Sequence, residues 1–237
     1  MGRTLLKAVA ALLVVVLLGG TGVWAETSPG TDIQERVARL AAGHHVRVLG
    51  TSDLPATLVD ALVATEDERF WEHHGIDVIG MTRALAYDAA RACVCEGGST
   101  ITQQLVKVVY LNGTNRGWNK VQGIALAFKV EILISKRQIL ADYFSIVPFG
   151  YGLYGADTAA CAYFGRHLAG LDLAQDAVLA GMPQQPAAYD PRAHPGAARA
   201  RREVVLRAMV GDGYITPSQA RAAAAAPVVN TPPPAGC

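Results

Sequence analysis

The N-terminal stretch limits the possible folds of this chain more than any other feature. Arg3 and Lys7 precede an uncharged run, Ala8–Ala25, that is rich in Leu, Val and Ala. This run reaches the lower limit of about 17 residues for crossing a bilayer core of roughly 30 Å, and it spans comfortably when Leu5 and Leu6 are counted. The basic residues on its N-terminal side predict that this end is cytoplasmic and that the remainder lies outside.

A cleaved signal peptide is the alternative interpretation of the same stretch. The most apolar part, Ala8–Leu18, is short for a membrane span, and Val23-Trp24-Ala25 fits a small-residue cleavage site. The residues themselves therefore leave two possibilities open, a retained membrane anchor over residues 1–25 and a removed leader.

The composition of the chain favours an all-α domain. With 237 residues and 51% hydrophobic content, the chain can build one sizeable core. Alanine is abundant, aromatic residues make up 7%, and alternating β-branched residues are scarce. The net charge of +1 argues against a nucleic-acid-binding surface. The sequence shows no zinc-type Cys/His spacing and no phosphate-binding loop of the GxxxxGK type.

Apolar periodicity and helix-start signals predict where the helices lie. We expect helices over residues 32–42, 54–64, 77–91, 100–111, 118–134, 136–146, 156–164, 173–181, 197–210 and 218–226. Thr216 is suited to cap the last of these helices, with Pro217 in its first turn. The expected organisation is a juxtamembrane linker over residues 26–53, one domain over residues 54–226 and a disordered Pro-rich tail over residues 227–237.

Residues 64–77 concentrate the groups that suit acid–base chemistry. Glu66 and Asp67 end an apolar run, and Phe70 and His73 follow within a few positions. A carboxylate beside aromatic and imidazole groups can be partly desolvated, which raises its pKa toward the range useful for proton transfer. Glu66 is therefore our candidate base. The alternative is a charged helix end with a packed Phe and solvated histidines.

A second polar stretch, residues 97–107, places three side chains on one face of a predicted helix. Thr100, Gln104 and Lys107 lie three or four positions apart, so all three can reach the same ligand. Apolar Ile101 and Leu105 lie on the adjoining face, which argues against a fully solvated helix.

Together the two stretches resemble the glycosyltransferase family that polymerises peptidoglycan from lipid II. The family's motif E-D-x-x-F-x-x-H-x-G is met by Glu66, Asp67, Phe70, His73 and Gly75. Its motif G-G-S-T-x-x-Q-Q-x-x-K is met by Gly97, Gly98, Ser99, Thr100, Gln103, Gln104 and Lys107. The resemblance implies a helical, lysozyme-like glycosyltransferase domain with a smaller membrane-facing lobe. It also implies one retained N-terminal transmembrane helix and a location in the plasma membrane.

The resemblance also implies a reaction and roles for individual residues. In this family the 4-hydroxyl of a lipid II acceptor attacks the anomeric carbon of the growing chain, which gives β-1,4-linked glycan with inversion and releases undecaprenyl pyrophosphate. Glu66 corresponds to the catalytic base. The implied substrate-binding residues are Asp67, Phe70, His73, Gly98, Ser99, Thr100, Gln103, Gln104, Lys107, Arg116 and Lys120. The last three of these, or a divalent cation such as Mg²⁺ or Mn²⁺, would neutralise the pyrophosphate.

The two glutamines also have an alternative role. Gln103 and Gln104 can be structural hydrogen-bonding groups of the loop and not ligands of the substrate.

The partners that the resemblance implies go beyond the substrate. They are lipid II, the nascent glycan, the membrane and other cell-wall synthases, with no nucleic acid.

The sequence departs from the family pattern on the donor side of the expected site. The family's third motif aligns without a gap over residues 119–131, where its arginine is Asn119 and its second active-site glutamate is Gly123. Glu131 cannot replace that glutamate, because it lies about 12 Å further along the helix axis than Gly123.

Two alternative functions follow from these observations. The first is a degenerate relative that binds lipid II or a synthase without turnover. The second is a lysozyme-like hydrolase of finished glycan, since a helical fold with one key glutamate also suits cleavage.

The four cysteines, Cys93, Cys95, Cys161 and Cys237, do not determine a disulfide pairing. A bond is chemically allowed outside the cytoplasm. We interpret Cys161 as a buried small residue in an alanine-rich helix.

Overall fold

The fold is helical throughout the part of the chain that the structure describes. A computed structural model describes residues 20–91, 98–114 and 116–229. Within these ranges there is no β-strand, only isolated bridges between His74 and Ile76 and between Pro148 and Tyr154. The all-α prediction is therefore confirmed for these residues.

The helices follow one another with short connections. A helical segment covers residues 20–26, and the labelled helices come after it. They are α2 (Ile33–Gly43), α3 (Ala56–Glu66), α4 (Val78–Arg91), α5 (Ile101–Tyr110), α6 (Trp118–Leu133), α7 (Lys136–Ile146), α8 (Ala156–Phe164), α9 (Leu173–Gly181), α10 (Pro195–Gly211) and α11 (Pro217–Ala225). Each corresponds to a predicted helix, with ends that differ by a few residues.

Local capping explains why several of these helices begin where they do. Thr100 and Thr216 each accept a hydrogen bond from the backbone N–H three residues later, and in both cases a glutamine side chain completes a capping box. Asp172 makes the same arrangement at the start of α9. The expected cap at Thr216, with Pro217 in the first turn, is confirmed.

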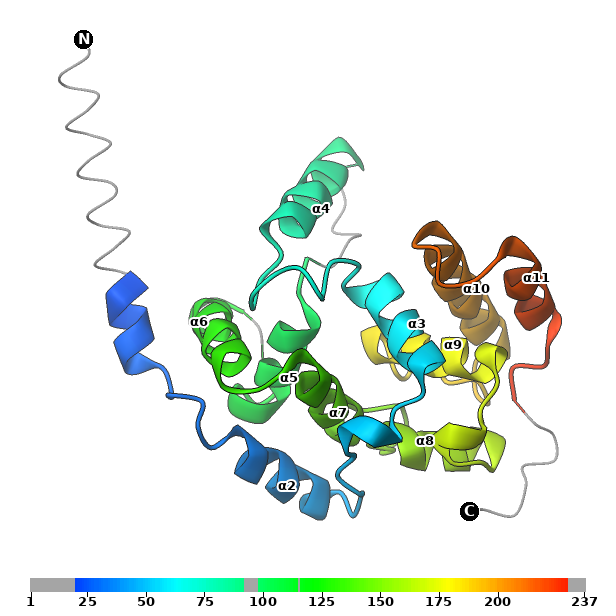
Figure 1. Ribbon diagram of the computed structural model, residues 1–237, viewed down its shortest axis with the longest axis horizontal. Coiled ribbons are helices and arrows are strands. Elements are labelled where there is room, and N and C mark those ends of the chain that lie inside the picture. Colours follow the sequence, from blue (N-terminus) through cyan, green and yellow to red (C-terminus); the bar gives the residue numbers. More distant parts are fainter. Residues whose placement is uncertain (1–19, 92–97, 115, 230–237) are drawn as a thin grey trace, which may run out of the picture.

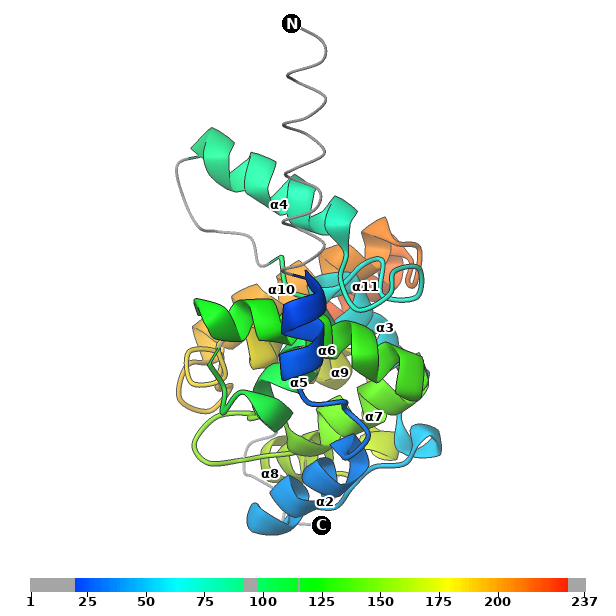
Figure 2. The ribbon, with the colours of Figure 1, turned by 90° about the vertical axis from the view of Figure 1, so that its left-hand side faces the viewer.

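Two groups of helices build the core. α3 packs against α9 and α10, and α5 packs against α6 and α7. α4 stands away from both groups in each ribbon view (Figures 1 and 2). The cleft at the end of α3 therefore has two different walls. One wall is α10, which belongs to the packed body, and the other is α4, which projects from that body.

The packed part of the chain extends beyond the boundaries expected from the sequence. Residues 26–53 were expected to form a linker, but α2 lies among them and buries Ile33, Val37 and Ala41 in the core. At the other end, Val228 is buried and the carbonyl oxygen of Pro227 accepts a hydrogen bond from Arg202. The start of the expected disordered tail is therefore held against α10, and residues 230–237 lie outside the described ranges.

The expected membrane anchor lies mainly outside the described residues, since residues 1–19 are not among them. Among the helices from residue 20 onward that the structure describes, none is long and apolar enough to span a bilayer.

The interpretation of Cys161 as a buried residue needs correction. Cys161 lies on α8, where it is half-buried and disulfide-bonded. The other cysteines, Cys93, Cys95 and Cys237, lie outside the described residues.

A buried acid lies between α3 and α9. Asp176 is fully buried, and one of its carboxylate oxygens accepts a hydrogen bond from the Thr57 hydroxyl. The other oxygen has no hydrogen-bond partner among the described residues. Burial raises the pKa of Asp176 to about 6, an effect that the Thr57 hydrogen bond only partly offsets.

This raised pKa predicts how stability depends on pH. The native pKa of about 6 lies above the 3.8 of an unperturbed aspartate, so the folded state binds the proton more tightly. The contribution of Asp176 to the free energy of unfolding therefore increases as pH falls through 6. Between pH 8 and pH 5 the wild type should gain roughly 1–2 kcal/mol that Asp176→Asn does not gain. Urea unfolding at both pH values measures this difference, and exposed Glu203→Gln is the control that should follow the wild type.

Candidate active site

The end of α3 opens into a cavity of about 300 Å³. Its walls come from α4 on one side and α10 on the other, with the start of α5 between them. The residues that line it are Ala64, Thr65, Glu66, Asp67, Glu68, Asp77, Gly80, Met81, Arg83, Ala84, Gly98, Ser99, Thr100, Gln184, Arg201 and Val204. The cavity thus brings residues from both polar stretches of the sequence together with residues from α10.

Glu66, the last residue of α3, is held at both of its carboxylate oxygens. Arg201 Nη2 lies 2.7 Å from Oε1, and the Gln104 side-chain amide donates to Oε2 at 3.0 Å. The carbonyl oxygen of that amide accepts a hydrogen bond from the Tyr143 hydroxyl at 2.9 Å. Burial, with a smaller effect from the charge of Glu66, raises the pKa of Tyr143 well above its ordinary value. The phenol therefore stays neutral and keeps Gln104 oriented with its amide nitrogen toward Glu66.

Arg201 is the residue that sequence reasoning missed. Its guanidinium also donates through Nε to the carbonyl oxygen of Gly181, at 3.0 Å, where α9 ends. A Cβ at Gly181 would lie 2.8 Å from Arg201 Cγ, so this helix end needs a glycine beside the arginine. The available signal was weak, a cluster of arginines at 199, 201 and 202 in an alanine-rich helix. Nothing local in it indicates contact with a residue 135 positions away.

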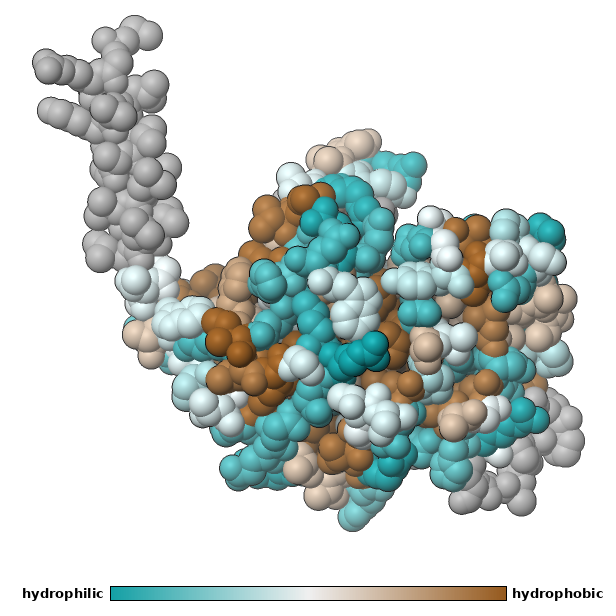
Figure 3. Space-filling view, viewed as in Figure 1, coloured by the Kyte–Doolittle hydropathy of each residue, from teal (hydrophilic) through white to brown (hydrophobic). Residues whose placement is uncertain are grey.

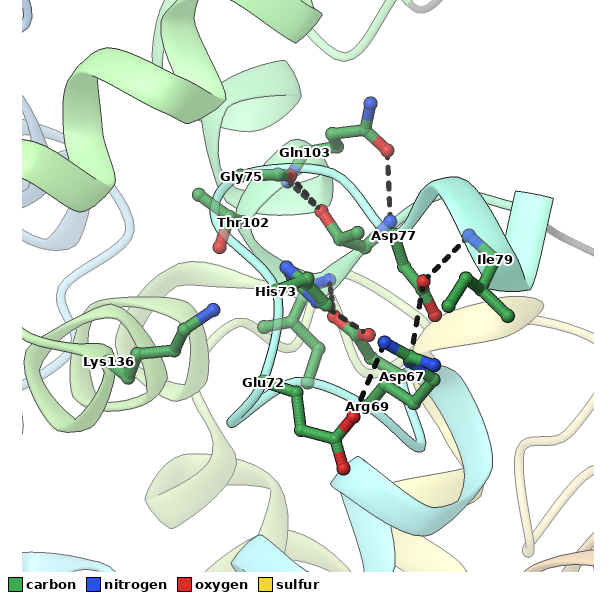
Figure 4. A network of polar contacts seen from close by, with 12 residues as sticks. Asp67, Arg69, Glu72, His73, Gly75, Asp77, Ile79, Thr102, Gln103 and Lys136 are labelled. Carbon is green, nitrogen blue, oxygen red and sulfur yellow. Dashed lines mark hydrogen bonds and ion pairs between the residues drawn. The ribbon is translucent and has the colours of Figure 1, made fainter.

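Asp67 follows Glu66 directly but turns into the interior. Its side chain is 2% exposed, and His73 Nε2 lies 2.8 Å from Oδ1 (Figure 4). The other oxygen accepts a hydrogen bond from the backbone N–H of Ile101 at 2.9 Å. This contact places the carboxylate at the N-terminus of α5, where the helix dipole favours negative charge. Asp67 therefore joins the end of α3 to the start of α5.

Two further residues expected to bind substrate form the cap of α5. Thr100 accepts a hydrogen bond from the backbone N–H of Gln103 and donates to the carbonyl oxygen of Gly75 at 2.7 Å. The side chain of Gln103 is buried and accepts from the backbone N–H of Thr100. The structural alternative for Gln103 is thus the one that the geometry supports, whereas Gln104 contacts Glu66.

The structure places Phe70 and His73, which were expected to contact a substrate, in the interior. The ring of Phe70 is fully buried, and Lys136 Nζ lies 4.4 Å from its centre. His73 is buried against Asp67. Lys136 also forms an ion pair with Glu131 at 2.9 Å, so these groups secure the loop between α3 and α4 against α7.

Comparison with known proteins identifies the family. The family described as Transglycosylase matches residues 34–210. The chain belongs to the transglycosylase family. Penicillin-binding protein 1A of Aquifex aeolicus is 41% identical over 166 residues, which cover 70% of this chain and 23% of that protein. Penicillin-binding protein 1A of Escherichia coli is 39% identical over 178 residues, which cover 75% of this chain and 21% of that protein.

The chain spans less than a quarter of the length of these two relatives. A crystal structure of penicillin-binding protein 1A from Haemophilus influenzae is also similar, with a TM-score of 0.46 and 23% identity. The match covers 78% of this chain and 18% of the chain in that crystal structure.

The cations expected at a transglycosylase donor site do not line the cavity around Glu66. Lys107 is half-buried on α5, and Arg116 and Lys120 are exposed near the start of α6. The arginines that do line the cavity are Arg201 and Arg83, and Arg83 forms an ion pair with Glu68 at 2.6 Å. Of the predicted binding residues, Gly98, Ser99 and Thr100 are among the lining residues, as is Asp67.

Gly123, which stands where the transglycosylase pattern has its second glutamate, is buried within α6. Asn119 is half-buried one turn before it. Glu131 is committed elsewhere, since it accepts a hydrogen bond from Thr102 at 2.5 Å and pairs with Lys136.

Gly75 tests how much the site depends on the loop that follows α3. Its φ is +75°, and a Cβ there would lie 2.7 Å from the backbone nitrogen of Phe128. Gly113 has the same φ, but nothing lies within 4 Å of its Cβ position. Gly75→Ala should therefore lower the free energy of unfolding by about 3 kcal/mol or more, and Gly113→Ala by about 1 kcal/mol. Denaturant unfolding measures both, and equal losses would show that the contact with α6 is unimportant.

Proposed function

We propose that the chain is a peptidoglycan glycosyltransferase that polymerises lipid II into β-1,4-linked glycan strands, with Glu66 as the general base. The observation that carries the proposal is the carboxylate of Glu66, which lines the cavity and is held at both oxygens by Gln104 and Arg201. The family supports a glycosyltransferase reaction, and the domain alone is the part shared with the penicillin-binding proteins.

The proposed step transfers one proton to the base and releases one leaving group. The 4-hydroxyl oxygen of the acceptor sugar forms a bond to the anomeric carbon of the donor, and the proton of that hydroxyl passes to Glu66. The bond between the anomeric carbon and the pyrophosphate oxygen breaks, with inversion. A carboxylate offers about four acceptor positions, so the two contacts with Gln104 and Arg201 leave others for the acceptor hydroxyl.

The pyrophosphate needs positive charge or hydrogen-bond donors at the other side of the cavity. Ser99 and the backbone at Gly98 lie there and supply donors, and Arg83 supplies a cation that its pairing with Glu68 holds in place. We further propose that Lys107, Arg116 and Lys120 act on the part of the lipid diphosphate that extends beyond this cavity.

The carboxylates around the cavity do not form an evident site for Mg²⁺ or Mn²⁺. Glu66, Asp67 and Glu68 each have a cationic or imidazole partner. No cluster of three or more metal-ligating side chains occurs among the described residues. We derive no step through a divalent cation.

The proposal includes a place in the cell. Residues 1–25 anchor the chain in the plasma membrane with the N-terminus in the cytoplasm, and the domain acts outside on a lipid-borne substrate. α4 forms the smaller lobe and faces the membrane, which its separation from the body supports. Lipid II, the nascent glycan and other cell-wall synthases are the proposed partners.

A relative that binds lipid II without turnover is the second candidate. The observation that favours it is the loss of the family's glutamate at Gly123 and of its arginine at Asn119. Binding of lipid II by the wild type without any glycan product supports this candidate, and polymerisation by the wild type eliminates it. Release of soluble fragments from purified cell wall would instead indicate a hydrolase.

The decisive variant is Glu66→Gln, which keeps the size and hydrogen-bonding shape of the side chain but cannot accept the proton. We expect the rate of glycan formation from lipid II to fall by about 10²- to 10⁴-fold, the range that general-base catalysis supplies. Gel analysis of labelled strands measures it, with exposed Glu203→Gln as the control. Equal strand yield from Glu66→Gln and wild type would remove Glu66 from this role.

Arg201→Lys tests whether the base must be oriented as well as present. A lysine keeps the charge but cannot contact Glu66 and the carbonyl oxygen of Gly181 together through a planar fork. We expect kcat to fall by about 10- to 100-fold with a smaller change in KM. Arg199→Lys, on an exposed position of the same helix, should leave both unchanged. A loss confined to KM would place Arg201 in substrate binding instead.

A further inference from the structure

Lys129 is a buried cation whose partners are all in the N-terminal segment of the described chain. Its residue is 7% exposed, and it lies on α6. The ammonium group donates to the carbonyl oxygens of Trp24 at 2.6 Å, Thr27 at 2.9 Å and Ser28 at 3.1 Å. It also contacts the Thr27 hydroxyl at 2.8 Å.

One of these acceptors, the carbonyl oxygen of Trp24, lies in the last turn of a helix, and the carbonyl oxygens of Thr27 and Ser28 lie just beyond its C-terminal end. The helical segment 20–26 ends at this point, so Lys129 caps it from another helix. The negative end of the helix dipole adds to the attraction, and the Trp24 ring lies 4.9 Å from the same nitrogen. Burial lowers the pKa of Lys129, and only good hydrogen bonds offset the cost of burying an ammonium group.

A second contact between the N-terminal segment and the helices of the body lies a few residues further along the chain. The Tyr110 hydroxyl, at the end of α5, donates its one proton to Asp32 at 2.9 Å, and its oxygen lies 3.2 Å from the carbonyl oxygen of Gly30. Gly30 has a φ of +84°, and a Cβ there would meet Leu133 Cδ1 at 3.3 Å. Residues 24–32 are therefore held to α5 and α6 at two points. Apolar side chains gather beside this junction over α6 (Figure 3).

We propose that Lys129 is a positioning residue that fixes the helical segment 20–26 to α6 and so sets the direction in which the N-terminal stretch leaves the domain. The proposal rests on the proposed function for its consequence, because a fixed direction holds the cleft at one orientation to a membrane-borne substrate. An apolar side chain of similar length fills the same space but leaves the carbonyl groups of residues 24–28 without their shared donor.

Hydrogen exchange of the full chain tests whether Lys129 holds the N-terminal segment against α6, and it does not require activity. Lys129→Met should speed exchange of the amides of residues 23–30 by at least about tenfold and leave the amides of α9 unchanged. Thr27→Val, which removes one of the four acceptors of Lys129 and the hydroxyl's own hydrogen bond to the carbonyl oxygen of Trp24, should give a smaller increase in the same residues. Gly30→Ala should give the same pattern without altering Lys129, and exposed Arg221→Met is the matched control.

The overturning results are equally specific. Unchanged exchange over residues 23–30 in both Lys129→Met and Gly30→Ala would overturn the proposal. If Lys129→Met does not fold, Thr27→Val and Gly30→Ala decide the question by themselves.

The rate of polymerisation in two environments tests whether the fixed direction of the N-terminal stretch matters for activity. We expect Lys129→Met to lose about tenfold in rate on lipid II in bilayer vesicles and to match the wild type in detergent micelles, where orientation to a plane is not imposed. Equal losses in both environments would indicate a general structural role and overturn the positioning role. A wild type without activity would refute the proposed function. Hydrogen exchange would still show whether Lys129 holds residues 23–30 against α6.

Discussion

The site depends on two neighbouring carboxylates that face opposite ways. Asp67 points inward, where His73 and the first backbone N–H of α5 hold it. Glu66 points into the cavity, where Arg201 and Gln104 hold it. Because the buried Asp67 contacts fix the backbone at the end of α3, they also fix the direction in which Glu66 leaves it. A short acidic pair in the sequence thus serves as an anchor and a functional group at once.

Sequence reasoning succeeded where the determinants are local. Helix positions follow from periodicity and from local signals such as the cap at Thr216, whose partner lies three residues away. The pairing of Glu66 with Gln104 was within reach because both belong to motifs of the family. Arg201 was not, because its contact with Glu66 spans most of the domain. The interior positions of Phe70 and Gln103 were equally hidden, since a motif marks a residue as needed and does not say whether it touches ligand or supports the residue that does.

α6 carries both Lys129, which contacts the N-terminal segment, and the buried Gly123. Lys129 and Gly123 lie six positions apart on this helix, about 9 Å along its axis. Glycine within a helix costs about 1 kcal/mol relative to alanine, yet α6 runs unbroken from Trp118 to Leu133. Buried Ala127 and Val130, which belong to the core, and the Lys129 hydrogen bonds lie on the C-terminal side of the glycine and secure that part of the helix.

The glycine at position 123 therefore leaves the scaffold in place. A helix that needed that side chain for its own stability would show a break or a compensating ion pair, and Glu131 is instead paired with Lys136 as part of the loop support. Glu66, our proposed base, has both of its hydrogen-bonding partners, Gln104 and Arg201, in place. Under the proposed function, any reduction in turnover would then arise on the donor side, where the cavity's cation apart from Arg201 is Arg83 on the projecting helix α4.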